Sequence, residues 1–226
     1  MDIYLDHAAS TPVREEVIQA MLPWLSEHPG NPSGSHRLAR EARRAIDDAR
    51  DNVAALVGAD PGNVIFTSGG TESDNLAIDG VLGAKGGQAV CSATEHPAVL
   101  EPVRDSGGMI VPTDETGRID LENLAALLDS IANISLVSIM MANNETGVIN
   151  DLDMAADLIA EKSPGSVIHT DAVQATSWLD VAELSKKVNL SSTPCWLRIN
   201  KLYKQGYICL LYTSDAADDT PCVDLC

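Results

Sequence analysis

Positively charged side chains are scarce in this 226-residue chain. Fifteen Lys and Arg residues stand against thirty-three Asp and Glu residues, which gives a formal net charge of −18. A surface with this balance repels phosphate backbones and anionic membranes, so we expect neither nucleic acid nor a membrane among the partners. The sequence also lacks any run of about 18 apolar residues and any basic N-terminal segment followed by an apolar one. These absences predict a soluble, cytoplasmic protein.

Cysteine pairs with the spacing of a zinc site or of a secreted disulfide framework are also missing. Of the five cysteines, Cys91 alone precedes residue 195, while Cys195, Cys209, Cys222 and Cys226 lie near the C-terminus. No Cys-x-x-Cys or paired histidine pattern occurs, so we predict no metal site. We expect Cys91 to be a buried thiol and the C-terminal group to mark a shift in composition.

The chain does contain enough apolar residues for a buried core. With 45% hydrophobic and 21% charged residues it is neither disordered, collagen-like nor a small disulfide scaffold. Thr11 is expected to cap a first helix with Pro12 at its first position, and the helix has an apolar face from Val13 to Leu25. A second helix has an apolar stripe over 42–56 and is expected to end at Gly58.

Short apolar runs alternate with helical patterns in the following part of the chain. The predicted strands are 64–67, 89–92, 109–111, 135–140 and 167–170, and the predicted helices lie near 71–83, 97–105, 120–131 and 152–162. Continuous apolar strands separated by helices are typical of a parallel sheet that is buried on both faces. We therefore predict an α/β fold of three layers, α/β/α, with a mostly parallel sheet.

Ligands of such sheets bind at the carboxyl ends of the strands, and polar clusters follow four of the predicted strands. Ser68-Gly69-Gly70-Thr71 turns from a strand into a helix, where free N–H groups suit a phosphate; an ordinary capped helix is the alternative. His96 precedes Pro97 in a turn, so it is either an acid/base group or a structural histidine.

Asp171 directly follows an apolar strand, where a buried carboxylate requires a cationic partner such as a protonated ring nitrogen. The alternative for Asp171 is a helix N-cap. Asn144 and Gln174 add neutral donors, which are otherwise ordinary loop hydrogen-bonding groups. Taken together, these residues favour a ligand with a phosphate, an aromatic ring and a basic ring nitrogen, and pyridoxal 5′-phosphate has all three.

Six motifs in the same order make the chain resemble a known family. They are Ile3-Tyr4-Leu5-Asp6-His7-Ala8-Ala9-Ser10-Thr11-Pro12, Gly30-Asn31-Pro32-Ser33, Phe66-Thr67-Ser68-Gly69-Gly70-Thr71-Glu72-Ser73-Asp74-Asn75, Thr94-Glu95-His96, Asn143-Asn144-Glu145-Thr146-Gly147 and His169-Thr170-Asp171-Ala172-Val173-Gln174. Over residues 1–184 the chain closely resembles the cysteine desulfurases, class V members of the fold-type I pyridoxal phosphate enzymes. The resemblance implies an incomplete large domain of that fold.

The resemblance also implies an activity and a set of partners. The family's homodimers take sulfur from L-cysteine, release alanine and pass the sulfur to acceptor or scaffold proteins of iron–sulfur and thio-cofactor assembly. By motif match, Gly70 and Thr71 would hold the phosphate and Asp171 would face the pyridine nitrogen. His96 would stack on the ring and move protons, Gln174 would bond the phenolic oxygen, and Asn144 would steady the ring or the substrate.

The resemblance ends near residue 184. The family's Schiff-base lysine, in a Ser-Ala-His-Lys or Ser-Gly-His-Lys segment followed by Gly-Pro-Lys-Gly, and its sulfur-accepting cysteine are both expected after that point. Neither context occurs, and Lys201 in Asn200-Lys201-Leu202-Tyr203 is only the nearest lysine. We hypothesise a reading-frame shift near 185–192 that runs into a sequencing adaptor by residue 209. Residues 185–226 are then an aberrant, disordered tail, and the chain is expected to be inactive.

Two other readings of the sequence remain. The chain could belong to another class V enzyme, an aminotransferase or a selenocysteine lyase, from which the missing sulfur-transfer loop would distinguish a desulfurase. It could also be a non-catalytic binding or scaffold protein of the same fold, an alternative to which the absent lysine gives superficial support. The full-length gene would discriminate these readings, since only a desulfurase restores both the lysine and the loop cysteine.

Overall fold

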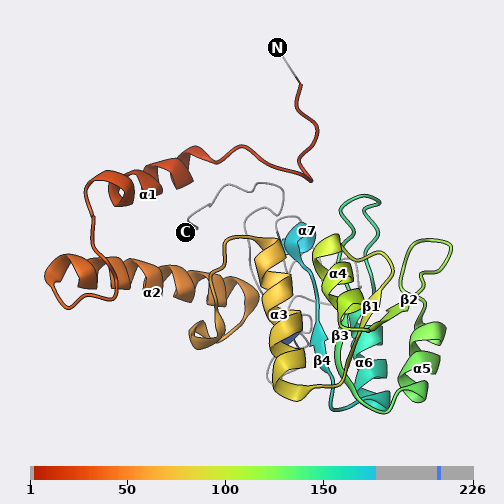
Figure 1. The fold of residues 1–226 in the computed structure, drawn as a ribbon. Helices are drawn as coiled ribbons and strands as arrows, with labels where there is room; N and C mark the ends of the chain where they lie inside the picture. The colour runs from red at the N-terminus through yellow and green to blue at the C-terminus, as the bar shows by residue number, and fades with distance from the viewer. Residues whose placement is uncertain (1–2, 177–207, 210–226) are drawn as a thin grey trace.

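The protein is represented by a computed structural model that describes residues 3–176 and 208–209 (Figure 1). Helices and strands alternate from residue 70 onward, as the sequence predicts. The elements in chain order are α1 Glu15–Ser26, α2 Arg37–Val57, the 3-10 helix η1 Pro61–Asn63, α3 Gly70–Lys85, β1 Gln88–Ser92, α4 Pro97–Asp105, β2 Met109–Val111, α5 Leu121–Ser130, β3 Ile134–Ser138, α6 Leu152–Lys162, β4 Val167–His169, α7 Val173–Thr176 and β5 Ile208–Cys209.

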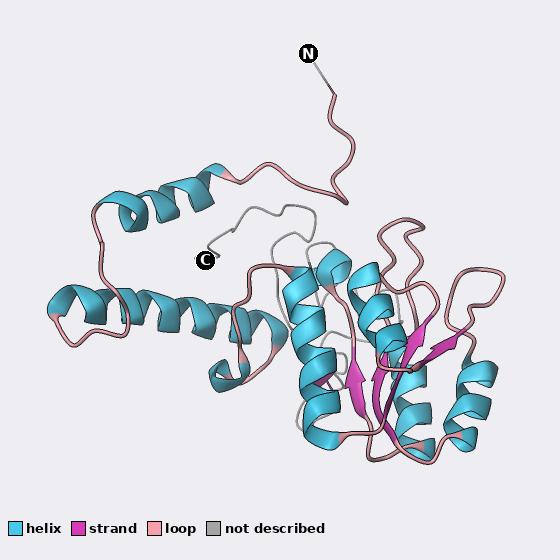
Figure 2. Ribbon diagram, viewed as in Figure 1, coloured by secondary structure: helices cyan, strands magenta, loops and turns pink. Residues whose placement is uncertain are grey.

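The strands, magenta in Figure 2, form one parallel sheet. Their order is β2-β1-β3-β4-β5. Because all pairs are parallel, every carboxyl end lies at the same edge of the sheet. The backbone pairing between β3 and β4 continues past both strands: Ile139 N donates to His169 O and Met141 N to Asp171 O. This continuation fixes the polar residues after β4 beside those after β3.

Alternate residues of the strands supply two separate cores. On one face, Val90, Val137 and Ile168 pack with apolar residues of α5 and α6. On the other face, Ala89, Cys91 and Leu136 pack with Ile78 of α3 and with Val99 and Val103 of α4. Strands that are apolar on both faces are therefore covered by helices on both sides, and the predicted three-layer α/β/α fold is confirmed.

Cys91 lies in the second of these cores and is fully buried, as expected. Burial raises the pKa of its thiol to about 12, the nearby Glu95 adds to this rise, and Arg104 opposes it. A thiol that stays protonated is a poor nucleophile, so Cys91 is a packing residue. Cys195, Cys222 and Cys226, together with Lys201 and the predicted frame shift, lie outside the described residues.

The predicted strand over 64–67 is wrong. These residues follow η1, and Val64 has an extended backbone, but none of the described strands pairs with them, and Ile65 is 51% exposed. The carbonyl of Val64 instead accepts a hydrogen bond from Arg50 Nε at 3.2 Å. An apolar, β-branched run indicates an extended backbone, but a strand also requires a neighbour with which to exchange hydrogen bonds.

The predicted start of the first helix is wrong as well. α1 begins at Glu15, and its N-cap, Arg14, makes no side-chain capping bond. Val13 is 57% exposed, so its side chain contributes little packing that would stabilise a helical turn at Thr11 and Pro12. Within α1 no residue is fully buried, and both α1 and α2 lie outside the three layers (Figure 1).

The predicted end of α2 is confirmed and can be tested by substitution. Gly58 has φ 69°, a left-handed conformation, and its N–H donates to Ala54 O. Replacing Gly58 with alanine is expected to lower the free energy of unfolding by about 1 kcal/mol, because the added Cβ is strained at this φ. Urea unfolding followed by circular dichroism measures the change.

Gly80 provides the matched control for that substitution. It lies inside α3, and a Cβ built on it meets nothing within 4 Å. Alanine at position 80 is expected to raise the free energy of unfolding by about 0.5–1 kcal/mol, the opposite sign, because it has the higher helix propensity. Equal effects at the two positions would contradict the argument.

Candidate active site

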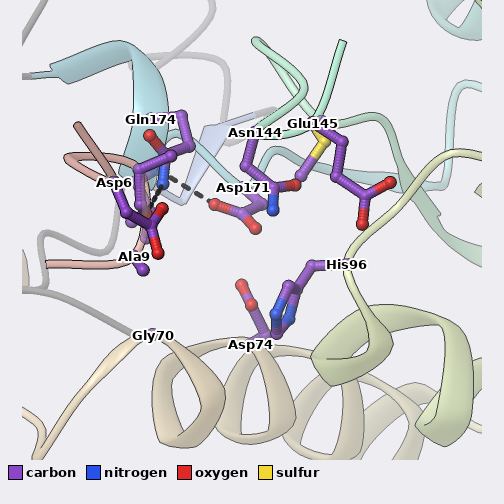
Figure 3. A pocket seen from close by; sticks show the side chains of 12 residues that line it. Asp6, Ala9, Gly70, Asp74, His96, Asn144, Glu145, Asp171 and Gln174 are labelled. Atoms are coloured by element: carbon purple, nitrogen blue, oxygen red, sulfur yellow. Dashed lines mark hydrogen bonds between the residues drawn. The ribbon is translucent and has the colours of Figure 1, made fainter. Parts of the chain in front are cut away.

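A cavity of about 310 Å³ lies at the carboxyl edge of the sheet (Figure 3). Its lining comes from the start of α3, the turn before α4, the loop after β3, the segment after β4 and the N-terminal segment. The lining residues are Asp6, Ala8, Ala9, Gly70, Asp74, His96, Met140, Asn144, Glu145, Asp171, Val173 and Gln174. Five of the six predicted site residues therefore meet in one cavity of the size that small ligands occupy.

Thr71 is the exception. It is the second residue of α3, directly after Gly70, but it is exposed and does not line the cavity. Its carbonyl accepts a hydrogen bond from Asn75 Nδ2 at 2.7 Å. The role that the family resemblance implies for the Thr71 hydroxyl thus stays a prediction.

Asp171 places a buried carboxyl in the cavity wall. It is 8% exposed, and its Oδ1 accepts a hydrogen bond from Val173 N at 3.0 Å. Burial raises the pKa of this carboxyl, while the Val173 bond and the charge of His96 oppose the rise. The described residues include no ion-pair partner of Asp171, so it still lacks the cation that a buried carboxylate requires. Its bond is to the first residue of α7, two residues further on, and the N-cap alternative stays a prediction.

The N-terminus of α3 faces the same cavity through Gly70. The residue before it, Gly69, is extended, and no side chain caps this helix. Glu72 Oε2 accepts from both Ser68 N and Ser68 Oγ at 2.6 Å, which holds the preceding turn in place. The first N–H groups of a helix have no partner inside it and attract anions, so this end of the cavity suits a phosphate.

His96 caps α4 and also borders the cavity. Its Nδ1 accepts from Ala98 N at 3.1 Å, and Pro97 occupies the first helical position. Because Nδ1 is an acceptor there, the neutral ring carries its proton on Nε2. Both alternatives for His96 are therefore compatible: a structural bond orients the ring and leaves the other nitrogen free for proton transfer.

Hydrogen bonds between loops place Asn144 and Gln174. Asn143 Nδ2 donates to Thr94 O at 2.9 Å, which joins the loop after β3 to the turn that carries His96. Gln174 Nε2 donates to Ala8 O at 2.9 Å, which holds the N-terminal segment over the cavity. Figure 3 shows Gln174 and Asp6 on one side of the cavity and Glu145 on the other.

Two buried acids at this site were not predicted from the sequence. Asp74 lines the cavity and is 5% exposed, and Glu95, whose Oε1 accepts a hydrogen bond from N of the lining residue Met140, is 4% exposed. Burial raises the pKa of each to about 8, and the charge of Asp171 adds to both shifts. Both residues lie inside the quoted motifs, but an acidic residue on a helix or in a turn is usually solvated, and only the tertiary structure shows their burial.

Neither a metal cluster nor a membrane span occurs in the part of the chain that the structure describes. No group of three or more His, Cys, Asp or Glu side chains there is arranged to hold a metal ion. No helix in residues 3–176 is both long and apolar enough to cross a membrane. None of the cavity-lining residues is a lysine.

Two family models match the chain. The model described as aminotransferase class-V matches residues 3–185. A model described as winged helix-turn-helix DNA-binding matches residues 173–208, nearly all of which lie outside the described residues.

Individual proteins also match. The chain is 41% identical over 221 residues to "Cysteine desulfurase IscS" of Neisseria meningitidis serogroup C, covering 93% of the chain and 52% of that protein. It is 44% identical over 190 residues to "Cysteine desulfurase IscS" of Dictyoglomus turgidum, covering 80% and 47%. A solved structure titled "SspA in complex with cysteine" matches with TM-score 0.69 and 33% identity, covering 76% of this chain and 51% of that one. The chain spans about half the length of the curated relatives it matches.

Proposed function

Since this chain belongs to the class-V aminotransferase family, we propose that it is the cofactor-binding part of a pyridoxal-phosphate-dependent cysteine desulfurase. The whole protein would take sulfur from L-cysteine, release L-alanine and pass the sulfur to an acceptor or an iron–sulfur scaffold protein. It would work as a cytoplasmic homodimer. The cysteine in the similar SspA structure supports L-cysteine as the substrate.

The observation that carries the proposal is the pairing of opposite electrostatic environments in one cavity. The buried carboxyl of Asp171 and the N-terminus of α3 at Gly70 both line it. A ligand with a cationic ring nitrogen and a phosphate satisfies both at once, because the nitrogen would supply the cation that Asp171 lacks. The residues present therefore fit pyridoxal phosphate, which, when bound, acts as an electron sink for the bonds at the substrate's α-carbon.

Each lining residue then has a definite task. Gly70, with Thr71 beside it, would hold the phosphate through backbone and hydroxyl donors, and Asp171 would keep the ring nitrogen protonated. His96 would cover the ring and exchange protons at Nε2, the nitrogen that its capping bond leaves free. Gln174 would donate its second amide hydrogen to the phenolic oxygen, and Asn144 would steady the ring or the substrate.

The proposal includes the division of the chain into residues 1–184, a partial large domain, and residues 185–226, an aberrant tail. The part that the structure describes ends, except for β5, before this boundary. The nucleotide sequence that encodes this chain tests the division. A genomic locus that encodes residues 185–226 in frame would contradict it, and a frame shift that restores a lysine segment would support it.

The activity of the chain as it stands is a separate prediction. Because no lysine among residues 3–176 lines the cavity and the family's lysine segment is missing from the sequence, we expect pyridoxal phosphate to bind weakly and without a covalent bond to the protein, and L-cysteine to yield no sulfide. Absorbance spectroscopy of the mixture detects an imine, and a colorimetric assay detects sulfide. An imine band or sulfide release would contradict the prediction that the chain lacks a Schiff-base lysine. Absence of binding even at a high concentration of pyridoxal phosphate would contradict the proposed cofactor site.

A further inference from the structure

Four buried polar side chains form a row from α3 to the turn before α4, and the row begins at the cavity. Asp74 Oδ1 lies 3.5 Å from His169 Nε2, and His169 Nδ1 lies 2.9 Å from Ser138 Oγ. Ser138 Oγ donates to Glu95 Oε2 at 3.4 Å, and Glu95 Oε1 accepts from Met140 N. Asp74 alone borders the cavity, while His169, Ser138 and Glu95 are almost fully enclosed. None of these four side chains has a task in the proposed function.

The titratable groups that face these four side chains come from several elements. Asp171 and His96 border it from the cavity, and Cys91 on β1 faces Glu95. Burial lowers the pKa of His169 to about 4, so its imidazole is neutral at physiological pH. Burial also keeps Asp74 and Glu95 protonated to higher pH than exposed acids.

A neutral imidazole has one N–H, so His169 donates on one side and accepts on the other. If its proton is on Nδ1, it donates to Ser138, Ser138 donates to an ionised Glu95, and Nε2 accepts from a protonated Asp74. If its proton is on Nε2, it donates to an ionised Asp74, while Glu95 is protonated and Ser138 donates to Nδ1. The protonation of the two carboxyls is therefore linked through the ring.

We propose that Asp74, His169, Ser138 and Glu95 form a relay that moves one proton between the two buried carboxyls. In the forward direction, the Asp74 O–H bond breaks as Nε2–H forms, and Nδ1–H breaks as a new Ser138 O–H forms. The original Ser138 O–H then breaks as Glu95 O–H forms. His169 and Ser138 end neutral, one proton has moved from Asp74 to Glu95, and the negative charge has moved from Glu95 to Asp74.

The cavity's contents set the direction of the relay. Without a ligand, the charge of Asp171 disfavours the anionic form of both carboxyls, but the Met140 N–H and the Ser138 hydroxyl donate to Glu95 and favour its anion, so near pH 8 we expect the first negative charge on Glu95. A cation bound beside Asp171 attracts the negative charge to Asp74, which borders the cavity. The effect of a ligand on the direction of proton transfer rests on the proposed function, whereas the relay itself rests only on residues of this protein.

Nitrogen NMR of His169 in the full chain tests the relay without a ligand. In Asp74→Asn at pH 9, only Glu95 ionises, so we expect the Nδ1–H tautomer; in Glu95→Gln, only Asp74 ionises, so we expect the Nε2–H tautomer. The two tautomers exchange the 15N shifts of the ring nitrogens, and a His169→Asn sample assigns the signals. The same tautomer in both variants would overturn the relay.

The unsubstituted chain with pyridoxamine 5′-phosphate, which forms no imine with a lysine, provides a second test. Its binding is followed separately by ligand fluorescence. If it binds at about pH 8, near the pKa of both carboxyls, we expect His169 to change from Nδ1–H to Nε2–H, and Ser138→Ala to abolish the change. Binding without a tautomer change would overturn the relay. Absence of binding would contradict the proposed function instead, and the variant comparison would still decide the relay.

Discussion

Replacing Asp171 with asparagine is expected to weaken the binding of pyridoxamine 5′-phosphate by about 10- to 100-fold. A hydrogen bond between two charged groups contributes about 1.5–3 kcal/mol, and asparagine leaves the ring nitrogen without its anion. The asparagine Oδ1 can still accept from Val173 N, so the start of α7 is kept. Titration followed by ligand fluorescence at pH 7 measures the dissociation constant.

The same substitution is expected to have the opposite effect on the ligand-free protein. Burial raises the pKa of Asp171, which means that its ionised form is unfavourable in the folded state. Asparagine removes that cost, so we expect the free energy of unfolding at pH 7 to be unchanged or higher. Asp157→Asn, at an exposed position on α6, is the control and should change neither quantity. Equal affinity of the Asp171→Asn and unsubstituted chains would contradict the role of Asp171.

The ligand-free chain is expected to lose stability steeply between about pH 6.5 and 8. Asp74 and Glu95 have pKa values raised to about 8, so above their unfolded pKa the folded state binds more protons than the unfolded state. Their stabilisation is complete at acid pH and is lost as the pH rises towards 8, by up to about 1.4 kcal/mol per pH unit and group. Asp171 acts in the same direction.

His169 determines where the loss becomes steeper. Its pKa is lowered to about 4, so its contribution has the opposite sign and increases from pH 4 to 6.5, where it offsets one acid. Above pH 6.5 the acids act alone, and we expect a fall of about 2–4 kcal/mol up to pH 8. Urea unfolding at a series of pH values measures it.

Asp74→Asn should remove about half of this fall, because asparagine does not titrate. Asp79→Asn, an exposed position on the same helix, removes the same charge from the surface and should leave the slope unchanged. The net charge of −18 also disfavours the folded state as pH rises, but both variants share that effect. A stability that rises from pH 6.5 to 8, or identical slopes in the two variants, would contradict the burial of ionisable Asp74.

Much of the fold could be predicted from local pattern. The strands at 109–111 and 167–169 and the helix at 97–105 occur within a residue of their predicted bounds, because apolar period and proline position act locally. Residues 64–67 show the limit of this approach. Their composition favours a strand, but pairing depends on a neighbour from elsewhere in the chain, which no local pattern specifies.

The candidate site shows the same division. His96, Asn144, Asp171 and Gln174 were predicted because they follow strands, and parallel strands bring their carboxyl ends to one edge. Gly70 was predicted to follow the strand over 64–67, which does not form, and it lines the cavity as the first residue of α3. Asp74 follows no strand. Its burial arises because α3 packs against β1 and β3, which turns that side of the helix towards His169.

The order of residues alone determined the alternation of helices and strands, the parallel sheet and the set of polar groups at its edge, since these depend on period, propensity and chain direction. Only the tertiary structure decided which acids are buried, that Asp74 reaches His169, and that the N-terminal segment closes over the cavity. The physical reason is that burial and the electrostatic coupling of two groups depend on distance in space, and residues far apart in the chain meet only after the layers have packed.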